Sequence, residues 1–178
     1  MTEAGRTLRQ LATAEDTRAL GERVAAVLRA GDLLVLTGPL GAGKTVFAQG
    51  IGAGLRVTGP VTSPTFVIAR VHDPDPADGG RLPLVHVDAY RLGSVAEVDD
   101  LDLDADLDQS VTLVEWGEGL VEHLADDWLE VRIDRSTPAD ADQPDERRAV
   151  ELIGHGGDWS ARLATMPSRR SASTATER

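Results

Sequence analysis

The feature that most constrains this chain is a glycine-rich loop between an apolar run and a helical segment. The run LLVLT at 33–37 has the length and composition of a strand buried on both faces. The loop GPLGAGKT at 38–45 follows directly and fits the spacing G-x-x-x-x-G-K-[ST]. The next segment, VFAQGIGAGL at 46–55, has helical character despite its glycines. A strand, this loop and a helix in that order predict a phosphate-binding loop.

Lys44 of this loop is the single lysine of the chain, whose other 17 basic residues are arginines. A compact ammonium can thread between the loop and the β- and γ-phosphates of a nucleotide, whereas a planar guanidinium has the wrong shape. The glycines let successive N–H groups point at the phosphates, and the hydroxyl of Thr45 can coordinate Mg²⁺. The residues expected to bind the nucleotide are therefore Gly38, Gly41, Ala42, Gly43, Lys44, Thr45 and Val46.

Helices and strands alternate along the chain. The segment 13–31 predicts a helix, with Thr13 as its N-cap, Asp16 three residues later and Gly31 at its end. A loop that runs into a strand is expected in SPTFVIARV (63–71). Strands are expected in LPLVHVDAYR (82–91), VTLVEW (111–116), WLEVRID (128–134) and RRAVELIGH (147–155). The last two alternate as an antiparallel pair would. The pattern predicts an α/β three-layer sandwich like that of P-loop NTPases, with a mainly parallel sheet and antiparallel edge strands.

Two of the apolar strands end in a carboxylate, at Asp88 and at Glu115. Ligands bind at the carboxyl ends of strands in open parallel sheets, and a P-loop site needs a carboxylate near its metal. We expect both acids in the site, but the residues alone do not separate the metal ligand from the group that orients water. His86 is either part of this site or a satisfied, partly buried side chain, and Trp116 is expected to pack. Thr65 in SPT lies either in a nucleotide-sensing loop or in an ordinary proline turn.

Composition and charge narrow the function classes. The 178 residues predict one domain over 1–165 and a disordered tail over 166–178, and the absence of cysteine excludes disulfides and thiolate metal sites. A net charge of −12 repels nucleic acids and anionic membranes, so direct RNA binding is not expected. No apolar stretch approaches the roughly 18 residues of a membrane helix, and the N-terminus does not resemble a signal peptide. We expect a soluble, cytoplasmic protein.

The acidic run DDLDLDADLD at 99–108 does not match a calcium-binding loop. Such a loop needs glycine at its sixth position, and Leu107 or Ala105 stands there, depending on the register. The run is expected to form a solvated face with Leu101, Leu103 and Leu107 turned inward, or a docking surface.

The motifs GPLGAGKT, SPTF, HVDAYR and LVEW, in this order and in so short a chain, resemble the TsaE (YjeE) family. Its members are the small P-loop ATPases of the bacterial machinery that synthesises threonylcarbamoyladenosine in tRNA. The resemblance implies that ATP with Mg²⁺ is hydrolysed to ADP and phosphate. It also implies a partner complex, TsaD–TsaB, that is driven or reset by this hydrolysis and that alone contacts the tRNA.

The resemblance assigns roles residue by residue. It implies that Thr45 and Glu115 hold Mg²⁺, that Asp88 lies by the γ-phosphate and that Thr65 belongs to a switch-like loop. Thr13 and Arg147 would border the nucleotide. The sequence departs from the family at Pro39, where an acid is common, which stiffens the loop without touching a ligand.

Two other functions fit the same loop. A small-molecule P-loop kinase has this length and this phosphate-binding loop, although a kinase should also carry an arginine-rich lid, for which DERR at 145–148 is a faint candidate. A nucleotide-dependent switch with slow turnover could instead act through the acidic segment 97–108.

Overall fold

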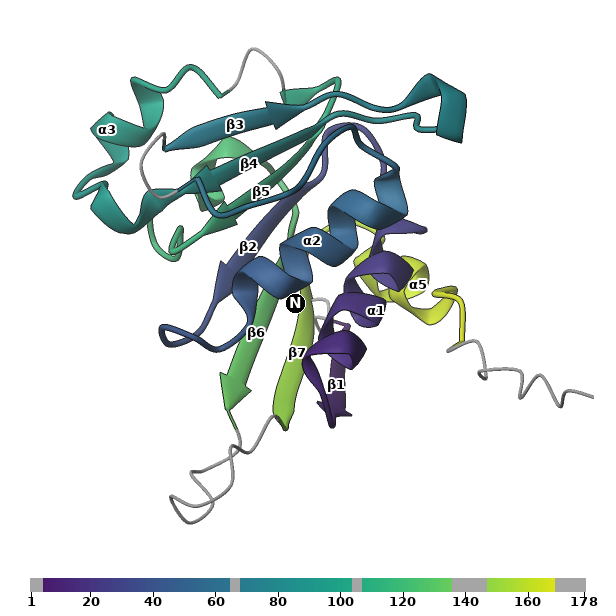
Figure 1. Cartoon of the computed structure of the whole chain (residues 1–178). Helices are drawn as coiled ribbons and strands as arrows, with labels where there is room; N and C mark the ends of the chain where they lie inside the picture. The colour runs from purple at the N-terminus through teal and green to yellow at the C-terminus, as the bar shows by residue number, and fades with distance from the viewer. Residues whose placement is uncertain (1–4, 65–67, 104–106, 136–146, 169–178) are drawn as a thin grey trace, which may run out of the picture.

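The apolar runs of the sequence form the strands of one mixed sheet. The computed structural model describes residues 5–64, 68–103, 107–135 and 147–168. The seven strands are ordered β1-β7-β6-β2-β5-β4-β3 (Figure 1). They are β1 (Arg6–Leu11), β2 (Leu33–Thr37), β3 (Ala69–His72), β4 (Leu84–Asp88), β5 (Val111–Glu115), β6 (Trp128–Arg135) and β7 (Arg148–His155). The helices are α1 (Ala14–Ala25), α2 (Lys44–Leu55), α3 (Val95–Asp99) and α5 (Trp159–Ala164).

The centre of the sheet is parallel and its edges are antiparallel, as the sequence predicts. The strands β4, β5, β2 and β6 pair in parallel. Strand β3 is antiparallel to β4 at one edge, and β7 and β1 add antiparallel strands at the other. The carboxyl ends of the central strands therefore lie side by side. We call this row of strand ends, which runs across the strand direction, the carboxyl edge of the sheet. Strand β7 begins at this edge because it runs antiparallel to β6.

Strand β1 is not anticipated by the sequence analysis. It pairs with β7 over all six of its residues, yet none of them is fully buried. A strand at the rim of a sheet carries little of the apolar alternation by which strands are recognised, so its pairing partner defines it.

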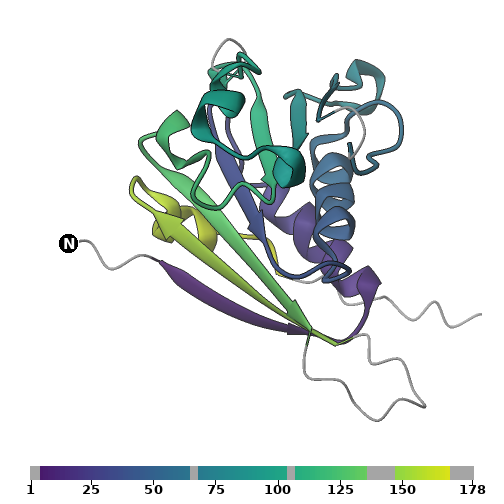
Figure 2. The same cartoon turned by 90° about the vertical axis from the view of Figure 1, so that its left-hand side faces the viewer.

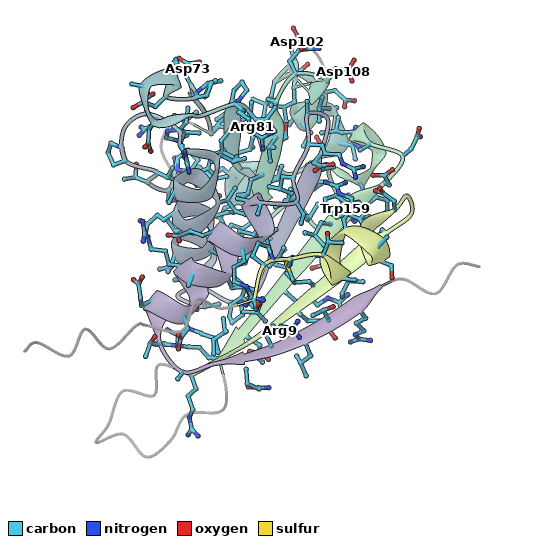
Figure 3. The ribbon with its side chains drawn as sticks, turned by 90° about the vertical axis from the view of Figure 1, so that its right-hand side faces the viewer. Arg9, Asp73, Arg81, Asp102, Asp108 and Trp159 are labelled. Carbon is cyan, nitrogen blue, oxygen red and sulfur yellow. The ribbon has the colours of Figure 1, made fainter. Side chains whose placement is uncertain are left out.

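Two apolar layers cover the sheet. Helices α1, α2 and α5 pack on one face, where Trp159 of α5 is almost fully buried (Figures 1 and 3). Helix α3 and the segment around Val121 cover part of the other face, over β4 and β5 (Figure 2). The inward leucines expected in the acidic run follow the prediction, because Leu103 and Leu107 are buried and Leu101 is half-buried. Asp102 and Asp108 lie at one end of the molecule, and Arg9 lies at the other (Figure 3).

Close packing between α1 and α2 explains the glycines of α2. A Cβ atom on Gly50 would lie 2.0 Å from the carbonyl oxygen of Arg18, and one on Gly21 would lie 2.5 Å from that of Phe47. No side chain fits at either position without moving a helix backbone. Gly21 of α1 and Gly50 of α2 therefore let the two helices approach closely.

The prediction for the end of α1 is wrong. Thr13 caps the helix as expected, with reciprocal hydrogen bonds to Asp16, but the helix ends at Ala25 rather than near Gly31. The carbonyl oxygen of Val27 accepts hydrogen bonds from Arg162 of α5 instead. These long-range bonds compete with the next helical turn.

Some predictions fall outside the described residues, among them Thr65 and the tail beyond 168. Met166 packs against the core, and the carbonyl oxygen of Pro167 accepts a hydrogen bond from Arg23. In the described part of the chain, no helix is long and apolar enough to span a membrane.

Candidate functional site

A cleft of about 540 Å³ opens at the carboxyl edge of the sheet. The loop after β2 and the ends of β4 and β5 contribute to its lining. Figure 1 shows that the ends of β4 and β5 and the loop after β2 lie on the same side of the sheet. Its lining consists of Leu40, Gly41, Gly43, Lys44, Thr45, Val46, Ser63, Asp88, Tyr90, Glu115, Trp116 and Arg148. The N-terminal end of α2 faces the cleft, so its free N–H groups and positive dipole end favour an anion there.

The loop holds a backbone shape that requires glycine. Gly38 has φ +142°, and a Cβ atom there would lie 2.1 Å from the carbonyl oxygen of Ile133 in β6. Gly43, directly before α2, has φ +112°. A side chain at position 38 is excluded because it would clash with β6, and a side chain at position 43 is disfavoured because of the backbone conformation. The loop is thus pressed against the neighbouring strand β6.

Lys44 is buried inside this loop. Its Nζ donates hydrogen bonds to the carbonyl oxygens of Gly38 (2.7 Å) and Pro39 (3.0 Å) and lies 3.9 Å from the ring centroid of Trp116. Burial lowers the pKa of the Lys44 ammonium, and the carboxylates of Glu115 and Asp88 partly oppose this shift. The ammonium is held by weak, neutral partners, so an arriving phosphate would be a stronger one.

Glu115 is almost fully buried at the end of β5. Its Oε1 accepts a hydrogen bond from the hydroxyl of Thr45 (3.3 Å) and lies 2.8 Å from Nε2 of His86. Thr45 and Glu115 were expected to share a metal ion, and the fold brings them together from positions 70 residues apart. His86 is fully buried rather than partly buried, and it contacts the site directly.

Asp88 lies at the end of β4, beside Glu115. Its Oδ1 accepts a hydrogen bond from the backbone N–H of Tyr90 (3.0 Å), and its Oδ2 accepts one from the hydroxyl of Ser63 (3.3 Å). Asp88 therefore also caps the short 3₁₀ turn Ala89–Arg91. Ser63 is the first residue of the SPT segment, and its hydrogen bond to Asp88 connects that segment to the cleft.

Two aromatic side chains form the mouth of the cleft. Tyr90 and Trp116 meet edge to face, with ring centroids 5.3 Å apart. Trp116 has φ +62°, a left-handed conformation that is costly for a bulky residue and is held by the surrounding structure. This conformation turns the ring onto Lys44, so Trp116 does more than pack.

The two neighbouring arginines at the start of β7 have different surroundings. Arg148 is buried and lines the cleft, and its Nε donates a hydrogen bond to the carbonyl oxygen of Ala42 (2.8 Å). Arg147, which the resemblance favoured, is exposed and is not part of the cleft lining. The alternation of Arg148, Val150 and Leu152 on one face is the sequence signal that identifies the inward arginine. Thr13 serves as the cap of α1 and does not line the cleft either.

The oxygen donors of the cleft suit a Mg²⁺ ion that is shared with a nucleotide. Among the described residues, no group of three or more His, Asp and Glu side chains can hold a metal ion by itself. Mg²⁺ at such sites is bound by one or two protein oxygens, phosphates and water. The hydroxyl of Thr45 and the carboxylate of Glu115 are hard oxygen ligands of this kind, so the residues present fit the ion.

Comparison with known proteins identifies the family. Residues 11–147 match the family model described as threonylcarbamoyl adenosine biosynthesis protein TsaE. The chain is 57% identical over 144 residues to the tRNA threonylcarbamoyladenosine biosynthesis protein TsaE of Streptomyces coelicolor, covering 80% of this chain and 93% of that protein. It is 52% identical over 132 residues to the protein of that name in Mycobacterium tuberculosis, covering 71% and 77%, respectively.

The fold is also similar to a solved structure. The crystal structure of YdiB from Bacillus subtilis superimposes with a TM-score of 0.70 and 28% sequence identity, covering 92% of this chain and 95% of that one. The chain is a member of the TsaE family and has that family's role in the biosynthesis of threonylcarbamoyladenosine in tRNA.

Proposed function

We propose that the chain binds ATP with Mg²⁺ in the cleft and hydrolyses it to ADP and phosphate. One observation carries this proposal: a buried lysine, a threonine hydroxyl and a glutamate carboxylate converge at the N-terminal end of α2. The Thr45 hydroxyl lies 3.3 Å from Glu115, and Lys44 lies within the same loop. These are the cation, the metal ligands and the anion-binding backbone that phosphoryl transfer needs.

The side chains of the cleft would have different roles in the hydrolysis. Lys44 would exchange its loop carbonyl partners for phosphate oxygens and neutralise charge as the terminal phosphate departs. Asp88 would accept a hydrogen bond from the attacking water and orient it toward that phosphate. Mg²⁺ bound with the nucleotide would neutralise charge on the phosphate oxygens, and Thr45 and Glu115 are the residues that would hold it.

We further propose that hydrolysis drives or resets a partner complex of TsaD and TsaB. The net charge of −12 supports a protein partner rather than direct contact with tRNA, since an acidic surface repels phosphates. In this proposal the partners bind the tRNA, and this chain supplies the hydrolysis.

The test is phosphate release from ATP by the purified chain, alone and with the TsaD–TsaB complex from the same organism. We expect stimulation by the complex and its loss in Lys44→Ala, with circular dichroism showing an intact fold. Undiminished turnover in Lys44→Ala would contradict the assignment of the loop. Phosphate transfer to a small-molecule acceptor would favour a kinase, and nucleotide binding without turnover or stimulation would favour a switch.

A further inference from the structure

His86 is a buried polar residue in the middle of β4, where its neighbours on either side in the strand are apolar. It lies in β4 between Val85 and Val87, and its side chain is 0% exposed. Strand pairing places it beside Leu113 of β5. Burying an imidazole among apolar neighbours costs free energy unless the ring makes hydrogen bonds. A leucine would suit the packing better, so the ring needs another explanation.

The ring of His86 contacts the candidate metal ligand, Glu115. Nε2 of His86 lies 2.8 Å from Oε1 of Glu115, which is itself 3% exposed. Within the described part of the chain, Nδ1 of His86 has no hydrogen-bond partner. A hydrogen on Nδ1 would be buried without an acceptor, which costs free energy. The arrangement therefore favours the tautomer that carries its hydrogen on Nε2 and donates it to Glu115.

This hydrogen bond restricts the carboxylate. Oε1 is shared between His86 and the Thr45 hydroxyl, at 2.8 Å and 3.3 Å, while Oε2 lies 3.5 Å from the same hydroxyl. A carboxylate fixed on one oxygen does not lose rotamer freedom when the other oxygen meets a ligand. Groups behind a metal ligand typically contribute about 10-fold to 100-fold in metal affinity through such orientation.

We infer that His86 is a positioning residue that orients the carboxylate of Glu115 for Mg²⁺. The inference rests on the proposed binding of Mg-ATP in this cleft. His86 acts through Glu115 and contacts neither nucleotide nor metal. Its neighbour His72, at the end of β3, is also buried and has no contact with Glu115, which makes it a matched control.

Two substitutions separate orientation from packing. The amide nitrogen of glutamine extends about as far along the side chain as Nε2 of histidine, whereas that of asparagine corresponds to Nδ1. His86→Gln can keep the hydrogen bond to Glu115, and His86→Asn cannot. His72→Asn introduces the same change into the control position.

The measurement is the Mg²⁺ concentration that gives half-maximal binding of a fluorescent, non-hydrolysable ATP analogue. We expect His86→Asn to raise this concentration about 10-fold or more. We expect His86→Gln and His72→Asn to remain close to the unmodified protein. Metal-free binding of the analogue should be equal in all four proteins. Equal Mg²⁺ requirements for His86→Asn and the unmodified protein would overturn the role of His86 alone, whereas Mg²⁺-independent binding by the unmodified protein would overturn the proposed metal site as well.

A second measurement does not depend on a folded variant. Long-range ¹H–¹⁵N correlation spectra of the unmodified, metal-free protein report which ring nitrogen of His86 carries hydrogen. We expect hydrogen on Nε2. A spectrum with hydrogen on Nδ1 alone would leave Nε2 unable to donate to Glu115 and would overturn the inference.

Discussion

Asp88 and Glu115 are direct neighbours in the parallel pair β4–β5, each at the last position of its strand. Their surroundings differ. Both oxygens of Asp88 accept hydrogen bonds, from the Tyr90 N–H and the Ser63 hydroxyl. The carboxylate of Glu115 instead accepts a hydrogen bond from the hydroxyl of Thr45, the residue that follows Lys44. The two carboxylates therefore have different hydrogen-bond partners, although each ends an apolar strand.

This difference predicts separable effects of the two acids. Glu115→Gln should raise the Mg²⁺ requirement for nucleotide binding about 10-fold or more, because an amide is a poorer metal ligand than a carboxylate. Asp88→Asn should leave that requirement nearly unchanged and slow phosphate release about 100-fold, as expected for the loss of a group that orients water. Mg²⁺ titrations of analogue binding and phosphate-release rates measure the two effects. The reverse result would exchange the roles.

Lys44→Arg should abolish high-affinity nucleotide binding even though it retains the positive charge. The ammonium fits between the carbonyl oxygens of Gly38 and Pro39 and the ring of Trp116, all within 4 Å. A guanidinium is larger and planar and cannot occupy that space without moving the loop. Isothermal titration with ATP and Mg²⁺ checks this, and binding within threefold of the unmodified protein would contradict it.

Arg148 should support the phosphate-binding loop, and its neighbour Arg147 should not. The Nε of Arg148 donates to the carbonyl oxygen of Ala42, and removing this charged donor should lower the free energy of unfolding by about 1.5–3 kcal/mol. We expect Arg148→Gln to lose this stability and to bind nucleotide more weakly. The exposed Arg147→Gln is the control in urea unfolding and nucleotide titration. Equal losses in both variants would rule out a specific role for the loop contact.

His72 should make stability depend on pH. Burial, followed by the influence of His86 and Arg70, lowers the pKa of His72 below its ordinary value of 6.5, although a hydrogen bond with the Thr58 backbone partly opposes this. Below pH 6.5 the unfolded chain then takes up a proton at His72 more readily than the folded one does. The free energy of unfolding should therefore fall as pH falls from 6.5 toward the folded pKa. Urea unfolding between pH 7.5 and 5.5 should show that the free energy of unfolding declines less steeply in His72→Gln than in the unmodified protein. An equal slope in the two proteins would show that His72 does not cause the decline.

The buried ion pair between Asp32 and Arg162 should be a major link between α5 and the rest of the fold. Both side chains are buried, and Arg162 also donates to the Val27 carbonyl and lies 3.9 Å from the Trp159 ring. Asp32→Asn should cost about 3–5 kcal/mol of unfolding free energy, because it removes the nearer charge partner of the buried guanidinium. The other partner, Asp158, is half-exposed and lies 3.7 Å from Arg162.

Chemical denaturation measures that loss, and the exposed pair between Arg18 and Glu22 in α1 is the control. Glu22→Gln should cost about 1 kcal/mol or less, since exposed ion pairs contribute little. Comparable losses in the two variants would show that burial does not strengthen the contribution of Asp32.

The short-range order of the sequence determined the phosphate-binding loop and the carboxylates near it. The run LLVLT, the glycines and Lys44 are adjacent, so their pattern predicts a strand, a loop and a helix without knowledge of any partner. Asp88 and Glu115 end apolar runs, and parallel pairing then brings them to one edge. The domain limits, the role of Thr65 and the identity of the nucleotide stay predictions.

Only the tertiary structure decided which side chains complete the site. His86 and Glu115 are 29 residues apart, and their contact depends on the register of β4 against β5. A shift of one residue would turn His86 to the opposite face. The choice of Arg148 over Arg147, the pairing of β1 and the early end of α1 depend likewise on long-range partners. Local patterns describe how a segment can fold, whereas strand register and packing decide what each side chain contacts.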